Sequence, residues 1–150
     1  MKIRKIRKSD FKEYVKLREN EAKNYSKVIG KKIEWPPKNI IRKEMKKAIQ
    51  DRKNYILVMI DKDSLIAYLH GVIEGYSNNL CGYVNYIFVI DKFRKKGVAR
   101  KLINEFLNIL KKKKIKKIRL RVNLKNKPAI RFYKKLGFET SHYEMESRVK

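Results

Sequence analysis

Cysteine, proline and glycine are scarce in this chain of 150 residues. Cys81 is the only cysteine, so no internal disulfide can form, and no apolar leader with a small-residue cleavage site is visible. These two absences predict a cytoplasmic protein. The three prolines and six glycines form no linker, and no repeat is visible, so the sequence predicts a single domain over residues 1–150.

Acidic residues are also few, because 15 Asp and Glu stand against 41 Lys and Arg and leave a formal net charge of +26. Such a charge bears on partners and solubility rather than on the fold. The lysine-rich run 111–117 has no interleaved aromatic residues on which bases could stack. Heat-adapted proteins are also rich in lysine. Nucleic acid is therefore kept as an alternative partner and is not favoured.

Long apolar helices are missing as well. Residues 64–90 carry a single formal charge, on Glu74, but glycines and the run 77–79 (Ser-Asn-Asn) interrupt them. No apolar helix of about 20 residues fits there, so no membrane association is expected. The Val, Ile, Tyr and Phe content instead predicts two buried antiparallel strands joined by a turn.

Helices and strands mix along the rest of the chain. Ser9 is the expected N-cap of a first helix, and residues 24–36 are expected to form a loop. Pro37 suits the first turn of a second helix whose buried side carries Ile41, Met45, Ala48 and Ile49. A third helix begins at Gly97 and a fourth covers 127–136, and further strands are expected at 2–7, 54–61, 117–122 and 138–147. This order predicts an α+β fold with a mixed sheet.

The segment 83–99 carries the strongest functional signal. A buried strand ends at Ile90, a short basic loop follows, and a helix opens at Gly97. The free N–H groups and the positive dipole end of such a helix bind anionic phosphate, and a glycine permits close approach to the backbone. The sequence therefore predicts a diphosphate site at 94–99, and a basic loop before an ordinary helix is the alternative. The motif is neither a Walker loop nor a dinucleotide fingerprint.

Two motifs together resemble the GNAT superfamily of acetyl-CoA-dependent N-acetyltransferases. The first is a strand ending in Val89, followed by Arg94-Lys-Lys-Gly97-Val-Ala99. The second is a helix that combines Asn126, Ala129, Tyr133, Gly137 and Phe138. The close match covers about 82–138. The resemblance implies a mixed, mostly antiparallel sheet of six to seven strands with splayed central strands and about four helices.

The resemblance also implies acetyl-CoA as co-substrate, with its pantetheine arm paired along Ile87, Phe88 and Val89. The backbone N–H near Val89 would hold the thioester carbonyl, and the pyrophosphate would lie on the residues of the loop and helix start: Arg94, Lys95, Lys96, Gly97, Val98 and Ala99. Asn126 would help to position the cofactor arm. Tyr133 would act as general acid toward the leaving thiolate, and an aromatic packing residue is the alternative.

The general base is the point at which the sequence departs from the family. Two positions that carry a carboxylate in many relatives hold Tyr83 and Arg121 here. Glu74 is the only carboxylate within 64–90 and is the candidate base, with a solvent-facing residue near a turn as the alternative. His70 shares its face if the strand alternates regularly, but a lone His in a sheet is more often packed in the core.

The acceptor is not readable from the sequence. Protein N-termini, lysines and small-molecule amines all fit an N-acetyltransferase, and an acetyltransferase-like module that binds RNA or ribosomes is the alternative function. The positive charge disfavours polycationic acceptors unless a local acidic pocket intervenes, for which the candidates are Glu13, Glu19, Glu21 and Glu34. Trp35 either lines the amine site or is a buried structural residue. No metal site is expected, Cys81 lacks an activating partner, and a monomer or a homodimer is expected.

Overall fold

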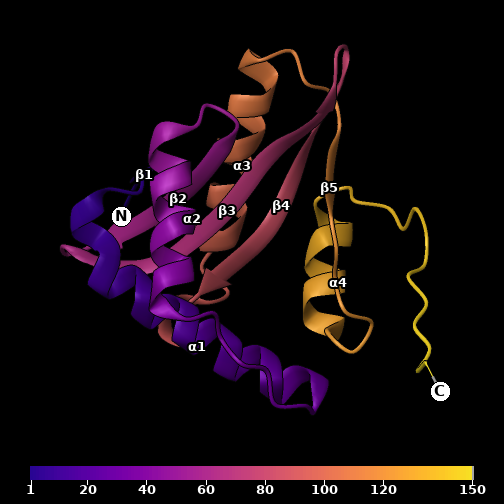
Figure 1. Ribbon diagram of the computed structural model, residues 1–150, viewed down its shortest axis with the longest axis horizontal. Coiled ribbons are helices and arrows are strands. Elements are labelled where there is room, and N and C mark those ends of the chain that lie inside the picture. Colours follow the sequence, from indigo (N-terminus) through magenta and orange to yellow (C-terminus); the bar gives the residue numbers. More distant parts are fainter. Residues whose placement is uncertain (150) are drawn as a thin grey trace.

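The computed structural model describes residues 1–149, whose centre is one five-stranded sheet with the strand order β1-β2-β3-β4-β5 (Figure 1). Its strands are β1 (Lys2–Lys5), β2 (Asn54–Asp61), β3 (Ser64–Tyr76), β4 (Asn79–Val89) and β5 (Ile118–Leu120). Neighbouring strands are antiparallel from β1 to β4, and β5 runs parallel to β4. The predicted α+β class with a mixed, mostly antiparallel sheet is therefore confirmed.

Helices cover both faces of this sheet. The four helices of the described residues are α1 (Phe11–Ile29), α2 (Lys38–Gln50), α3 (Val98–Lys112) and α4 (Lys127–Lys135). Helices α1 and α2 pack with Val58, Tyr68 and Phe88 on one face, and α3 packs on the opposite face with Leu57 and Leu69 (Figure 1). We call these the α1/α2 face and the α3 face. No helix within residues 1–149 is long and apolar enough to cross a bilayer.

Two glycines allow α3 to lie close to the sheet. A Cβ added to Gly71 on β3 would lie 2.6 Å from the Phe106 ring, and one added to Gly82 on β4 would meet Leu110. Phe106 and Leu110 belong to the apolar stripe of α3 and are buried. The apolar stripe of α3 therefore packs where two neighbouring strands carry no side chain. This close contact positions the helix over β3 and β4.

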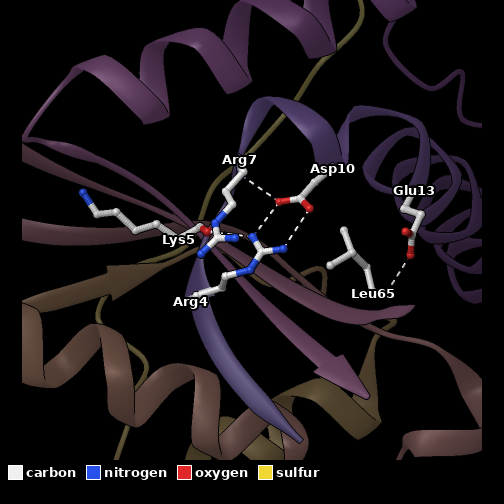
Figure 2. A network of polar contacts seen from close by, with 6 residues as sticks. All are labelled: Arg4, Lys5, Arg7, Asp10, Glu13 and Leu65. Carbon is white, nitrogen blue, oxygen red and sulfur yellow. Dashed lines mark hydrogen bonds and ion pairs between the residues drawn. The ribbon is translucent and has the colours of Figure 1, made fainter. Parts of the chain in front are cut away.

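The corner between β1 and α1 is fixed by Asp10 rather than by Ser9. The Asp10 carboxylate accepts hydrogen bonds from both terminal guanidinium nitrogens of Arg4, at 2.7 and 2.9 Å, and from the backbone N–H of Arg7 at 2.7 Å (Figure 2). The prediction of Ser9 as N-cap is wrong, because a 3-10 turn, Lys8–Asp10, precedes α1 and the cap residue is Asp10. In the same region the Glu13 carboxylate accepts the Leu65 N–H at 2.7 Å, which ties α1 to β3.

Three further expectations need correction. Residues 24–29 continue α1, which ends at Gly30 in the left-handed conformation, so only the later part of 24–36 is a loop. Ile49 is more exposed than its helix partners, because the buried stripe of α2 consists of Ile41, Met45 and Ala48. No strand forms within 139–149, so the described sheet has five strands rather than six or seven. Tyr143 and Met145 are exposed there, so the apolar side chains of this segment pack against no neighbour within the described chain.

Candidate active site

The strands β4 and β5 separate after a short stretch of parallel pairing. Gly82, Tyr83 and Val84 pair with β5, whereas residues 85–89 have no partner on that side within the described chain. A register shift between β3 and β4 leaves Asn85 without an opposite residue at the point where the separation begins. In Figure 1, β4 and β5 diverge below their contact. The predicted splay of the central strands is present, and on this side of β4 it leaves residues 85–89 without a strand partner and open to an extended ligand, except that the Val89 carbonyl accepts from Arg94.

The end of β4 leads directly to the start of α3. Gly97 is the N-cap of this 15-residue helix, has a φ of 76° and leaves the helix without a side-chain cap. A Cβ on Gly97 would meet no protein atom within 4 Å, so the space before the helix is open. The first N–H groups of the helix therefore point toward solvent, which is the arrangement that binds phosphate oxygens.

The predicted phosphate-binding residues contribute in different ways. Lys95 and Lys96 are exposed, but Val98 is buried in the core, so only its backbone faces a ligand. The Arg94 side chain turns back to β4, where its Nε donates to the Val89 carbonyl at 3.0 Å and its Nη2 pairs with Asp91 at 3.0 Å. Arg94 thus fixes the angle between β4 and the loop, and the two lysines are the charges free to meet an anion.

Helix α4 contributes Asn126 and Tyr133. Asn126 caps the helix as predicted, because its Oδ1 accepts the Ala129 N–H at 3.2 Å. Tyr133 is 9% exposed and packs against Phe132 and Phe138 on the α3 face. Burial and, secondly, the negative charge of Glu21 raise the pKa of Tyr133 to about 12. Tyr133 therefore keeps its proton at neutral pH, as a proton donor must.

A cluster of ionisable residues, the Glu21 cluster (Arg18, Glu21, Glu44 and Tyr68), lies on the α1/α2 face. The Arg18 side chain is 3% exposed, its Nη1 donates to Glu44 Oε2 at 3.2 Å, and its Nε lies 3.6 Å from Glu21 Oε2. The Tyr68 hydroxyl donates to the same oxygen of Glu21. Burial raises the pKa of both carboxyl groups, and the Tyr68 hydrogen bond and the Arg18 charge oppose that shift at Glu21.

This cluster was not predicted as a unit from the sequence. Glu21 was expected only as one of four carboxylates of a candidate acidic pocket, of which Glu13 accepts the Leu65 N–H. The available signal was the spacing of Tyr14, Arg18 and Glu21, which places three polar side chains on one face of a helix whose other buried residues are apolar. Nothing local pointed to Tyr68 or Glu44 as their partners.

Glu74 is not brought near Val89, the end of the splayed stretch that leads to α3. It pairs in register with Cys81 and is exposed near the β3–β4 turn, whereas Val89 lies eight residues further along β4. At about 3.4 Å per residue, that separation is roughly 27 Å. The solvent-facing alternative fits this position better than the role of general base does.

The structure also shows what surrounds three other residues that the sequence singled out: His70, Cys81 and Trp35. His70 is buried beside Tyr86, with its Nε2 3.4 Å from Asn54 Oδ1, and burial followed by the charges of Arg18 and Lys47 lowers its pKa to about 4. The interpretation of His70 as a packed core residue is confirmed. Burial raises the pKa of Cys81, which disfavours a thiolate nucleophile. Trp35 is 43% exposed in the α1–α2 loop, so it is not a buried structural tryptophan.

Two shallow surface hollows lie away from this region, one beside Lys43 and Lys47 of α2 and the other beside Met1 and Arg4. Neither borders the splay. Within residues 1–149, no three His, Cys, Asp or Glu side chains gather as a metal site would require. The candidate site therefore consists of the open edge of β4, the start of α3, Tyr133 and the Glu21 cluster.

Solved structures share this architecture over the whole chain. A mutant form of the BH1408 protein of Bacillus halodurans superposes with a TM-score of 0.84 at 22% identity and covers 100% of both chains. The aminoglycoside 6'-N-acetyltransferase AAC(6')-Ig of Acinetobacter haemolyticus gives a TM-score of 0.79 at 19% identity, covering 100% of this chain and 99% of its own. At these identities the likeness establishes the fold.

Curated relatives match over shorter segments. The uncharacterized N-acetyltransferase MJ1207 of Methanocaldococcus jannaschii is 43% identical over 56 residues, which are 37% of this chain and 25% of that protein. The N-terminal acetyltransferase B complex catalytic subunit NAA20 of Arabidopsis thaliana is 33% identical over 75 residues, which are 49% of this chain and 43% of that protein. The matched segments thus span less than half the length of these relatives. Residues 14–138 match the acetyltransferase (GNAT) family, so the splay, the uncapped α3 and the α4 motif have a common explanation: the chain belongs to that family.

Proposed function

We propose that this chain transfers an acetyl group from acetyl-CoA to a primary amine by direct attack within a ternary complex. The observation that carries the proposal is the continuity of the open edge of β4 with the uncapped start of α3. A ligand with an extended amide-containing arm and a diphosphate can pair with the first and place its phosphates on the second. Coenzyme A has both features.

The residues of the site then take separate roles. The backbone of Ile87, Phe88 and Val89 pairs with the pantetheine arm, and the N–H near Val89 stabilises the oxyanion that forms on the thioester carbonyl. The backbone from Arg94 to Ala99, with the charges of Lys95 and Lys96, binds the pyrophosphate. These positions are supported by the unpaired strand edge and by the open space before Gly97.

Helix α4 supplies the remaining groups. Asn126 holds the start of the helix beside the cofactor arm, and Tyr133 donates its proton to the departing thiolate. With a pKa of about 12, Tyr133 holds its proton at neutral pH, which a proton donor requires, and its place on the helix capped by Asn126 supports the role itself.

The acceptor is a primary amine: a protein N-terminus, a lysine or a small molecule. Two relatives bear names that refer to N-terminal or N-alpha acetylation, and a structural neighbour is named for aminoglycosides. The net charge of +26 repels polycations over a Debye length of about 8 Å at physiological ionic strength. We therefore expect an acceptor with a carboxylate near its amine, such as an acidic N-terminal peptide or a free amino acid.

The test measures free thiol release from acetyl-CoA with spermidine, a lysine-rich peptide, an acidic N-terminal peptide and a free amino acid, at low and high salt. We expect turnover with at least one amine and a higher kcat/KM for the acidic peptide than for spermidine at low salt. A preference for spermidine that persists at low salt would refute the acceptor class. Binding of acetyl-CoA without thiol release for any amine would refute the enzyme and favour a binding module.

A further inference from the structure

The Glu21 cluster lies over the part of β4 that the splay leaves open. Tyr68, which bonds to Glu21, stands opposite Phe88 in the β3–β4 register. The Arg18 guanidinium carbon, beside the same carboxylate, lies 4.1 Å from the centre of the Tyr86 ring. Residues 86 and 88 belong to the stretch that has no β5 partner. Glu21 therefore approaches the opening from the α1/α2 face.

Tyr133 approaches the same opening from α4. It packs with the α3-face core, yet the negative charge of Glu21 acts on its hydroxyl. Glu21 on α1 and Tyr133 on α4, 112 positions apart in the sequence (133 − 21), thus belong to elements on the two faces of the sheet, and the charge of Glu21 contributes to the raised pKa of Tyr133. Val89, where we expect the thioester carbonyl, is in the apolar cluster of Tyr133 and follows Phe88, whose register partner Tyr68 bonds to Glu21.

We propose that Glu21 receives the proton of the acceptor ammonium and so acts as the general base, an inference that rests on the acetyl transfer proposed above. One oxygen of its carboxylate is available for this task. Both contacts of the group, with Tyr68 and with Arg18, are made by Oε2, and Oε1 has no partner among residues 1–149. The side chain keeps 20% exposure, so the free oxygen can meet a ligand.

The local charge suits an ammonium ion. Two carboxylates, Glu21 and Glu44, share one guanidinium, so the cluster has a net charge of −1 within a chain of +26. The titratable and charged groups that face Glu21 come from five elements: Tyr14 and Arg18 on α1, Glu44 on α2, Tyr68 on β3, Tyr86 on β4 and Tyr133 on α4. Burial holds the pKa of Glu21 above its usual value, toward the pH at which a base must exchange protons.

The proton balance closes with these two residues. Glu21 takes one proton from R–NH3⁺ and releases it to solvent. The neutral amine forms the N–C bond at the thioester carbonyl, and collapse of the tetrahedral adduct breaks the C–S bond. Tyr133 gives its proton to the sulfur, and the second proton that the nitrogen loses restores the phenol. The products are the N-acetyl amine and coenzyme A with a free thiol.

The first experiment compares Glu21→Gln with Glu19→Gln, because Glu19 lies on the same helix, α1, and within residues 1–149 its carboxylate contacts neither the Arg18 guanidinium nor Tyr68. Gln keeps an oxygen that accepts from Tyr68, and unchanged acetyl-CoA-induced thermal stabilisation shows that a variant is folded and binds the cofactor. With the best amine of the panel at pH 6, we expect kcat to fall by about 10²–10⁴-fold in Glu21→Gln. In Glu19→Gln we expect a fall of less than tenfold.

The pH profile separates a base from a merely structural residue. Without Glu21 the acceptor must arrive unprotonated, so kcat/KM of Glu21→Gln should rise about tenfold per pH unit below the pKa of the acceptor. For a peptide α-amine that value is about 7.7–8.0. The defect relative to the unchanged protein should therefore shrink at least tenfold between pH 6 and pH 9. Parallel profiles, or equal losses in the two variants, would overturn the proposal.

A second measurement needs no turnover. The ¹³Cζ resonances of labelled Tyr133 and Tyr68, assigned through their Phe variants, should both shift as Glu21 titrates, and Glu21→Gln should abolish this step. No step at Tyr133 would overturn the placement of Glu21 at the splay. If the protein acetylates none of the amines, the proposed function fails, and the Tyr133 resonance still decides whether Glu21 faces the opening.

Discussion

Replacement of Gly97 by Glu tests the phosphate site most directly. Gly97 has a φ of 76°, and a side chain there would extend into the open space before α3. Glu would place both bulk and negative charge where we expect the pyrophosphate. Gly30 offers a matched control, because it has a φ of 69° at the end of α1 and is equally free of neighbours within 4 Å.

The magnitudes separate backbone strain from ligand binding. A left-handed conformation costs a residue with a Cβ about 1–2 kcal/mol, so both Gly97→Glu and Gly30→Glu should lower the Tm of the free protein. Acetyl-CoA at 100 times its Kd stabilises the unchanged protein by about 2.7 kcal/mol. At about 2–4 °C per kcal/mol for a chain of this size, that is a rise of roughly 5–11 °C.

The assay is thermal unfolding with and without acetyl-CoA. Gly30→Glu should keep the full ligand-induced rise of Tm, and Gly97→Glu should lose it although both free proteins are destabilised alike. A folded Gly97→Glu protein with the unchanged rise would show that the diphosphate lies elsewhere. Loss of the rise in both variants would show that strain, and not the phosphate contact, decides binding.

Three other predictions address chemistry, packing and pH. Tyr133→Phe keeps the ring and removes the donor, so acetyl-CoA affinity should hold while single-turnover transfer slows by about 10²–10⁴-fold; an unchanged rate would refute the general acid. Gly71→Ala should cost about 1–3 kcal/mol in urea unfolding, because its Cβ meets Phe106, and Phe106→Leu should relieve part of that cost; additive losses would contradict the clash. Asp10→Asn should cost about 1.5–3 kcal/mol at neutral pH. Its hydrogen bond with Arg4 holds the pKa of Asp10 below the unfolded value of about 3.9, so this stabilisation is complete above that pH and is lost as pH falls through the folded pKa. A difference in Tm that does not shrink as the pH falls below about 3.9 would refute the assignment.

Local sequence signals identified most of the cofactor side of the site. Gly97 begins α3 and Asn126 caps α4 as predicted, because a helix start depends on the conformation and side chain of one residue and its next neighbours. Val89 ends its strand, and Tyr133 is buried on α4, at the spacing that the two motifs predicted. Where the backbone preferences of neighbouring residues decide the local structure, the sequence was sufficient to predict it.

Other expectations failed because competing contacts decided them. Ser9 is a good N-cap by residue type, but Asp10 takes that position because Arg4 of the neighbouring strand binds its carboxylate. The strand expected at 138–147 has strand-forming residues, yet Tyr143 and Met145 stay exposed and no strand forms. Propensity is a weak preference that such tertiary contacts override.

The sequence by itself therefore determined most of the helices and strands, the glycine turn before α3 and the family. Only the tertiary structure decided which carboxylate meets the opening between β4 and β5. Glu74 lies on a central strand and nevertheless falls near the far turn, whereas Glu21 lies on a helix outside the motifs and reaches Tyr68, 47 positions away. The physical reason is that proton-transfer groups act through distance and burial in space. Both are fixed by how α1 packs on the sheet, and no spacing within the chain encodes that packing directly.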